Sequence, residues 1–220
     1  MMDYSHARRN MIDSQLRPNG VNDRRVLGAL LEIPRERFVS ARRRPLAYID
    51  EDIEVKAGAP GRHLMEPMAF AKLLLLADPR GSDLVLDVGC ATGYSTAVLA
   101  QLADSVVGLE CDSELAAAAE AALVDLGVAN AAIVSGSLAA GYASQAPYDV
   151  IILEGAVETI PDPLFDQLRE GGRLVAIVQD GPVGKATLYQ MVDGVISSRV
   201  AFDASVTALP EFQRPPAFTF

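Results

Sequence analysis

The stretch Leu84-Val85-Leu86-Asp87-Val88-Gly89-Cys90-Ala91-Thr92-Gly93-Tyr94 decides the fold. An apolar run that holds one aspartate and ends in a glycine-rich turn is typical of a buried parallel strand leading into a ligand-binding loop. Residues 95–102 follow with apolar side chains at helical spacing, and residues 105–110 form a second apolar run that ends in Glu110. The pattern predicts a strand, loop, helix, strand and acid unit that could hold an adenosine.

The residues of this unit favour a sulfonium cofactor over a dinucleotide. Gly89 and Gly93 let the backbone turn tightly beside a ligand, and Glu110, about 20 residues further on, can accept hydrogen bonds from ribose hydroxyls. The GxGxxG spacing of a dinucleotide site is absent. Asp87 would repel a pyrophosphate but attract the positive charges of S-adenosylmethionine. We therefore expect methyl transfer. The alternative is an ordinary strand-to-helix turn, with the acid only capping the next helix at Asp112 or Ser113.

The remaining patterns predict a doubly wound, mostly parallel Rossmann-like α/β methyltransferase sheet. Further strands are expected at 132–134, 148–153 and 173–178, an antiparallel C-terminal pair at 187–192 and 195–202, and helices at 6–16, 23–31, 68–77 after Pro67, 113–126, and from Pro163 with Asp162 as cap and Gly171-Gly172 as its end. In such sheets ligands bind at the carboxyl ends of the strands, where the strand order reverses. The loop after Val88, Glu110, residues 135–137 and the residues after Leu153 should converge there.

The length of 220 residues predicts one domain. We divide it into an N-terminal helical cap (1–62), a cofactor-binding α/β core (63–206) and a C-terminal tail (207–220). Within the cap, the acidic stretch 48–55 is interpreted as a charged edge strand. Arg42-Arg43-Arg44 is interpreted as a solvated helix end.

Composition narrows the partners and the location. With 19 basic and 29 acidic residues the formal charge is −10, which disfavours nucleic acid as the main partner. No apolar run approaches the roughly 20 residues that span a bilayer, and the first residues lack a signal-peptide core, so we expect a cytoplasmic protein without a membrane partner. Cys90 and Cys111 are not spaced as metal ligands with His6 and His63, and no metal is predicted.

Short motifs spread along the chain resemble those of one enzyme family, the protein-L-isoaspartate O-methyltransferases. They are Met11, Gln15-Leu16, Pro34-Arg35-Glu36-Arg37-Phe38-Val39, Ala47-Tyr48, Asp50, Pro67, Asp87-Val88-Gly89, Thr92-Gly93-Tyr94, Glu110, Ala146-Pro147-Tyr148-Asp149, Ile160-Pro161, Gln167-Leu168 and Gly171-Gly172-Arg173-Leu174-Val175. The resemblance implies a class I enzyme that uses S-adenosylmethionine, leaves S-adenosylhomocysteine, and esterifies isoaspartyl residues in damaged proteins or peptides. It leaves the oligomeric state open.

The resemblance also implies site residues. The loop from Gly89 to Gly93 would hold the methionine part of the cofactor and Glu110 its ribose. The full cofactor-binding set that we expect is Asp87, Gly89, Cys90, Ala91, Thr92, Gly93, Tyr94, Glu110, Cys111, Gly136 and Ser137.

The chain departs from the family at positions that bear on function. Met65 stands where the family has its functional serine, and His63 beside it is a candidate polar contact. Ser137 replaces the aspartate expected at the adenine, a change of about 1 kcal/mol, or about fivefold in affinity. Ala91 replaces a loop glycine, which matters if that residue needs a positive φ. The tail also lacks the family's arginine-led substrate segment. A different methyl acceptor, or a catalytically silent cofactor-binding module, therefore remain alternatives.

Overall fold

A seven-stranded sheet forms the centre of the computed structural model, which describes residues 4–59 and 61–214. The strand order is β5-β4-β3-β6-β7-β8-β9. The strands are β3 (Leu84–Val88), β4 (Ser105–Glu110), β5 (Ala131–Ser135), β6 (Tyr148–Val157), β7 (Leu168–Val178), β8 (Gly184–Val192) and β9 (Val195–Ala204). Neighbours from β5 to β7 run parallel, whereas β8 and β9 are antiparallel additions. The predicted doubly wound sheet with an antiparallel C-terminal pair is thus confirmed.

The helices agree largely with the sequence patterns. They are α1 (Tyr4–Met11), which continues through one π-helical turn (Ile12–Leu16), α2 (Arg24–Glu32), α3 (Pro67–Ala77), α4 (Tyr94–Ala100), α5 (Ser113–Leu126) and the single turn α6 (Asp162–Phe165). The side chains of Asp23 and Asp112 cap α2 and α5 by accepting hydrogen bonds from backbone amides of the first turn. Gly127 ends α5 with a φ of 68°.

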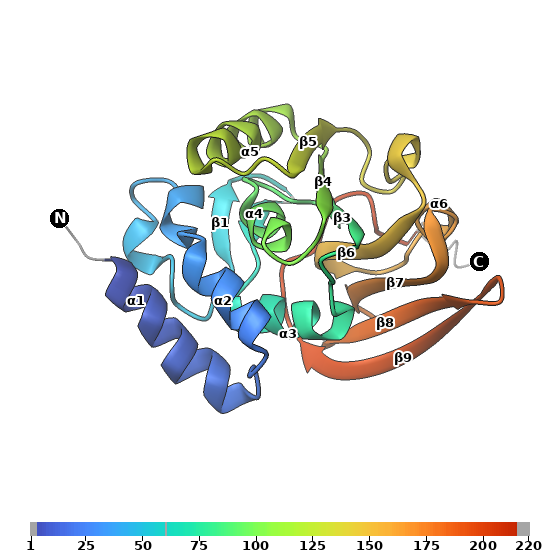
Figure 1. Cartoon of the computed structure of the whole chain (residues 1–220), viewed down its shortest axis with the longest axis horizontal. Helices are drawn as coiled ribbons and strands as arrows, with labels where there is room; N and C mark the ends of the chain where they lie inside the picture. The colour runs from blue at the N-terminus through green and yellow to red at the C-terminus, as the bar shows by residue number, and fades with distance from the viewer. Residues whose placement is uncertain (1–3, 60, 215–220) are drawn as a thin grey trace, which may run out of the picture.

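The two faces of the sheet carry different cores. Val85, Val106 and Val150 point into an apolar cluster with α2, α3 and α4. Their neighbours in sequence, such as Leu86 and Ile151, point to the opposite face, where Leu209 and Phe212 of the C-terminal segment cover them. In Figure 1 the N-terminal helices α1 and α2 lie on one side of the molecule and the far end of the β8–β9 hairpin lies on the other. Both faces of β3, β4 and β6 are therefore buried, as their continuous apolar runs require, whereas the edge strand β5 is partly exposed.

Three expectations for the connecting segments were wrong. The helix expected from Pro163 to the glycine pair is one turn, Asp162 provides no side-chain cap, and β7 already begins at Leu168. Gly171 and Gly172 lie in an irregular part of β7, where Tyr148 pairs with Leu168 but Val150 pairs with Arg173. Arg42-Arg43-Arg44 forms a turn and the start of a 3-10 turn (Arg44–Leu46), so it does not end an α-helix.

The acidic stretch 48–55 becomes a strand only at its end. There β1 (Ile53–Lys56) pairs with β2 (Arg62–Leu64) in a separate antiparallel sheet. Asp50 instead accepts a hydrogen bond from the amide of Met68 at 2.9 Å, and Asp52 accepts one from the amide of Glu66 at 2.8 Å. These carboxylates satisfy free amides at the start of α3, so Asp50 and Asp52 contact a helix and do not belong to an edge strand.

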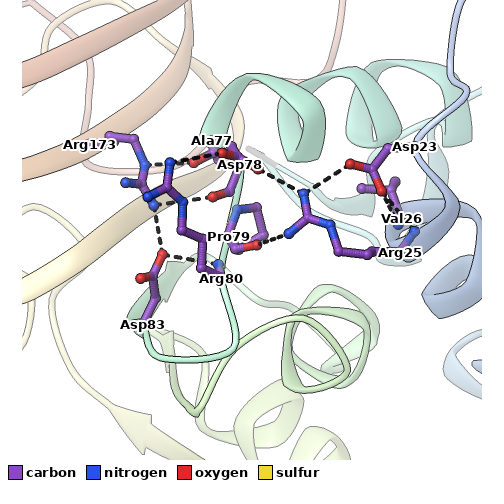
Figure 2. Close-up of polar contacts among 9 residues, drawn as sticks. All are labelled: Asp23, Arg25, Val26, Ala77, Asp78, Pro79, Arg80, Asp83 and Arg173. Carbon is purple, nitrogen blue, oxygen red and sulfur yellow. Dashed lines mark hydrogen bonds and ion pairs between the residues drawn. The ribbon is translucent and has the colours of Figure 1, made fainter.

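Two arginines fix the connection between α3 and β3, at the amino-terminal edge of the sheet (Figure 2). Arg173 of β7 donates to the Ala77 carbonyl at 2.7 Å and to the Asp83 carboxylate at 2.6 Å. From the other side, Arg25 of α2 donates to the Pro79 carbonyl at 2.9 Å and to the Asp78 carboxylate at 2.8 Å. The N-terminal helices are in this way joined to the sheet at the edge opposite the predicted ligand site. Among the described residues, no helix is long and apolar enough to cross a membrane.

Candidate functional site

The predicted loop lies at the point where the strand order reverses, between β3 and β6. Its backbone returns on itself through a hydrogen bond from the Gly93 amide to the Cys90 carbonyl at 2.8 Å. Gly89 and Gly93 have φ values of 81° and 88°, and a side chain at Gly93 would lie 2.9 Å from Ala119. Ala91 also has a positive φ, 50°. A residue with a Cβ in this conformation costs about 1 kcal/mol, so the alanine strains the loop.

Glu110 is fully buried at the end of β4, and both of its carboxylate oxygens have partners. One oxygen accepts from the Ala91 amide at 2.8 Å and from Arg62 Nη2 at 2.6 Å. The other accepts from the amides of Cys111 and Asp112 at 3.0 and 3.1 Å. Asp112 caps α5, so Glu110 does not serve as the cap of this helix. Glu110 connects the 89–93 loop to the start of α5, and Arg62 donates to the same carboxylate oxygen as the loop amide.

Arg62 is the residue that sequence reasoning missed most clearly. Its side chain is 7% exposed, and Nη2 also donates to the Gly89 carbonyl at 3.0 Å. Its Nε and Nη1 atoms are buried without a hydrogen-bond partner among the described residues. The guanidinium thus lies between the loop and Glu110, where the ribose of an adenosyl group was expected.

Asp87 lies under the loop and contacts the first turn of α4. One carboxylate oxygen accepts from Ser95 Oγ at 2.7 Å and from Thr96 Oγ1 at 2.6 Å, and the other is buried without a partner. Burial raises the pKa of Asp87 to about 7, the two hydroxyls lower it, and the charge of Glu110 raises it further.

Glu154, near the end of β6, is a second residue that was not singled out. It is 8% exposed, and its Oε1 atom has no hydrogen-bond partner within the described chain. Burial raises the pKa of Glu154 well above its usual range, and the nearby Asp87 charge raises it further, whereas Arg35 lowers it. The only signal in the sequence was its place just after Leu153, at the edge where four segments were expected to converge.

The C-terminal segment covers this edge. The amide of Ala156 donates to the Thr207 carbonyl at 3.0 Å, and the amide of Leu209 donates to the Ala156 carbonyl at 2.8 Å. The Leu209 side chain lies against Gly89 and Gly155, so closely that a Cβ added at either glycine would be less than 3 Å from it. Ser137 Oγ donates to the Glu211 carboxylate at 2.6 Å. The serine expected at the adenine therefore contacts the chain's own C-terminal segment.

Little space is left around these side chains. Two small cavities of about 10 Å³ each lie here, about the volume that one water needs. Both are lined by His63, Met65 and Glu154. A cavity of about 450 Å³ lies at the opposite edge, beside the starts of β3 and β4, away from the loop and Glu110. We take the small cavities as the site, because their walls contain Arg62, His63 and Glu154, each with a buried polar atom that has no partner among the described residues.

The other predicted residues surround the two cavities or support their walls. Met65 is buried, and its carbonyl accepts from Arg35 Nη2 at 2.7 Å. His63 is half-buried, and its Nδ1 atom has no partner among described residues. Thr92 donates to the Phe38 carbonyl at 2.6 Å, away from the crevice. The rest are placed as follows: Cys90 and Tyr94 are buried in the wall of one cavity, while Cys111 and Gly136 are exposed.

The hydrogen-bond donors and acceptors of the site suit an adenosyl sulfonium, whereas the cavities are too small to hold one. Gly89 and Gly93 give the backbone the close approach that such a ligand needs, and Asp87 places one oxygen nearby that is buried and has no partner among the described residues. Sites for ligands of this size have volumes of about 300–1,000 Å³. Arg62 and Leu209 fill the crevice, so both side chains must move before such a ligand enters. Among the described residues, no group of three or more His, Cys, Asp and Glu side chains could hold a metal ion.

Residues 7–203 match the sequence model of the family described as protein-L-isoaspartate(D-aspartate) O-methyltransferase (PCMT). The chain belongs to this family. Among PCMT relatives, the protein-L-isoaspartate O-methyltransferase of Koribacter versatilis (strain Ellin345) is 43% identical over 188 residues, which are 86% of this chain and 81% of that protein. Protein-L-isoaspartate O-methyltransferase 2 of Anaeromyxobacter sp. (strain Fw109-5) is 40% identical over 185 residues, which are 84% of this chain and 74% of that protein.

Solved structures agree with the PCMT assignment. A protein-L-isoaspartate O-methyltransferase superposes with a TM-score of 0.81 at 26% identity, over 93% of this chain and 67% of that one. A Plasmodium falciparum structure described as a beta-aspartate methyltransferase in complex with S-adenosyl-L-homocysteine gives a TM-score of 0.78 at 19% identity, over 96% and 100% of the two chains. At that identity the second comparison shows only that the fold is shared.

Proposed function

We propose that this chain is an S-adenosylmethionine-dependent methyltransferase that esterifies the free carboxylate of isoaspartyl residues in proteins or peptides. The observation that carries the proposal is the convergence of the 89–93 loop and Glu110 at the reversal of strand order, in a chain of the PCMT family. The protein or peptide substrate and the cytoplasmic location stay predictions.

In this proposal the bound cofactor supplies a sulfonium-activated methyl group, and the protein positions the reactants. The backbone of residues 89–93 contacts the methionine part, and Glu110 accepts hydrogen bonds from the ribose. Cys111, Gly136 and Ser137 follow the neighbouring strands β4 and β5 and would lie beside the base. Transfer to a carboxylate is a direct displacement by a nucleophile that is already ionised, so orientation matters more than a general base.

Cofactor binding must displace two side chains of the enzyme. The Arg62 guanidinium must leave Glu110, because the ribose hydroxyls need the same carboxylate oxygen. Leu209 must withdraw from Gly89, because the backbone there is in contact with its methyl groups. The segment 207–213 is held by backbone hydrogen bonds to Ala156, Glu158 and Thr159, and by its buried Leu209 and Phe212 side chains. Asp52 also holds Thr207, and Glu211 accepts hydrogen bonds from Ser137 and Ala139. The segment lies outside the seven-stranded sheet, so it can shift while the seven strands keep their pairing.

Two measurements test the proposed function. Methyl transfer from radiolabelled S-adenosylmethionine to an isoaspartyl peptide should exceed transfer to the same peptide with ordinary aspartate, and calorimetry should detect S-adenosylhomocysteine binding. Glu110→Gln should weaken that binding, whereas Glu120→Gln, an exposed change on α5, should leave it unchanged. Binding without transfer to either peptide would point to another acceptor. No binding at millimolar concentration would refute an adenosyl cofactor altogether.

A further inference from the structure

Glu154 occupies the wall between the two small cavities of the site. One cavity extends from it toward Arg62 and the C-terminal segment, and the other extends toward the 89–93 loop. Met65 and His63 line both cavities with it. Glu154 therefore shares its surroundings with the position where the family has a serine hydroxyl and this chain has a thioether.

The carboxyl group of Glu154 has hydrogen-bonding capacity that the protein does not use. Oε1 is buried and has no partner among the described residues. Leaving a buried polar atom unpaired costs about 1–3 kcal/mol. Such an atom in a cavity wall, on a side chain that is more than nine-tenths buried, indicates a contact with a ligand.

The surrounding groups determine which of two buried carboxyl groups, that of Asp87 or that of Glu154, carries the proton. Asp87 accepts hydrogen bonds from two hydroxyls, which stabilise its charged form, while Glu154 Oε1 has no donor within the described part of the chain. The charge of Asp87 acts on Glu154, and two buried carboxylates that interact in this way do not both ionise readily. The other charged or titratable groups that line the two cavities are Arg35, Asp52, Arg62, His63, Cys90 and Tyr94. Glu154 is thus the neutral member of the pair and holds an O–H that can donate.

A neutral carboxyl is what a carboxylate acceptor needs at this position. Hydrogen-bond donors must hold the isoaspartyl carboxylate so that one of its oxygens lies in line with the methyl group. The thioether of Met65 offers no donor. An ionised Glu154 would repel that carboxylate in the low-dielectric site. A neutral one would bind it through a charge-assisted O–H···O⁻ hydrogen bond, which is about twice as strong as a neutral one.

We propose that Glu154 is a substrate-binding residue that donates a hydrogen bond to the acceptor carboxylate, in place of the hydroxyl that Met65 lacks. This inference rests on the proposed function. It names a carboxylate as the acceptor class and requires no change in the bonds that form and break.

The test compares Glu154→Gln with Glu154→Leu in steady-state transfer to the isoaspartyl peptide. Glutamine keeps a donor without a charge, so its KM should stay within about threefold of wild type, a difference of less than one hydrogen bond. Leucine removes the donor, and KM for the peptide should rise at least about tenfold, the value of one charge-assisted bond. In the leucine background, Met65→Ser should recover part of the loss.

The controls separate this inference from the proposed function. Calorimetry should give the same S-adenosylhomocysteine affinity for wild type and both variants, and thermal melts should show that all three fold. An unchanged KM in Glu154→Leu would overturn the role of Glu154 while the isoaspartyl activity stands. Equal losses in the two variants would show that Glu154 acts as an anion, which also overturns the inference. Wild-type protein that binds S-adenosylhomocysteine but neither methylates nor binds the peptide would refute both.

Discussion

Arg62 Nη2 lies 2.6 Å from the Glu110 carboxylate, and both side chains are buried. The same nitrogen contacts the Gly89 carbonyl, so one guanidinium bridges the loop and the acid that the cofactor is proposed to use. Separating a buried ion pair is costly unless each charge finds a new partner. In the proposed complex, the ribose hydroxyls therefore compete with Arg62 for Glu110.

Replacing Arg62 by glutamine should strengthen S-adenosylhomocysteine binding by about tenfold, because the ribose no longer has to displace a cation from Glu110. Isothermal calorimetry measures the change. The matched control is Arg173→Gln, which removes an ion pair of the same 2.6 Å length at the opposite edge of the sheet. Weaker binding in Arg62→Gln would mean that Arg62 contacts the cofactor directly.

Arg173→Gln should instead lower the free energy of unfolding. Arg173 holds the Ala77 carbonyl and the Asp83 carboxylate, whose side chain is only 6% exposed (Figure 2). Its loss leaves a nearly buried carboxylate without its cation, at a cost of about 2–3 kcal/mol. Urea denaturation should show this as a lower midpoint with an unchanged slope. A midpoint equal to that of wild type would show that the connection between α3 and β3 does not depend on this contact.

Ser137→Asp should favour the cofactor in two ways. It restores the carboxylate that the family resemblance implies at the adenine, and it places a negative charge against Glu211, which Ser137 now contacts. The repulsion should displace the segment around Leu209, and affinity for S-adenosylhomocysteine should rise about fivefold. Ser197→Asp, an exposed change on β9, is the control. Equal affinities in both variants would show that position 137 does not face the base.

Glu66 makes stability depend on pH. Burial and the neighbouring Asp50 and Asp52 raise its pKa from 4.5 to about 7 in the folded protein. The folded state therefore holds this proton more tightly than the unfolded state, and stability falls as the pH rises from about 4.5 to about 7. Glu66→Gln should match wild type at pH 4 and exceed it at pH 8 in urea denaturation. An advantage of similar size at both pH values would contradict this, and Glu120→Gln on α5 serves as the exposed control.

The local patterns predicted the centre of the fold. The strands Leu84–Val88 and Ser105–Glu110 begin and end where the sequence placed them, because buried parallel strands have strong local signatures. The helix between them was expected over residues 95–102 and is found at Tyr94–Ala100. Glycine was misleading at 171–172, since a glycine pair ends a helix and also permits an irregular strand. Asp50 and Asp52 were misread for a similar reason, as their partners Met68 and Glu66 lie beyond the local window.

The sequence named candidate site residues in several segments, but it could not predict which side chains from different segments meet. Arg62 and Glu110 are 48 residues apart, and Ser137 and Glu211 are 74 apart, so no local pattern could join them. Glu154 follows a predicted strand, but its missing hydrogen bond is visible only when the surrounding side chains are in place. The positive φ of Ala91 likewise required the backbone.

Asp52 connects the C-terminal segment to the start of α3. One of its oxygens holds the Glu66 amide, and the other holds the amide and hydroxyl of Thr207, at 2.6 and 2.8 Å. A single carboxylate thus clamps the root of the C-terminal segment to the first turn of α3. In deuterium exchange, the amides of residues 66 and 207 should lose protection together in Asp52→Asn, while those of β4 keep theirs. Entry to the crevice would then be controlled from a side chain that lies in the N-terminal sixty residues of the chain.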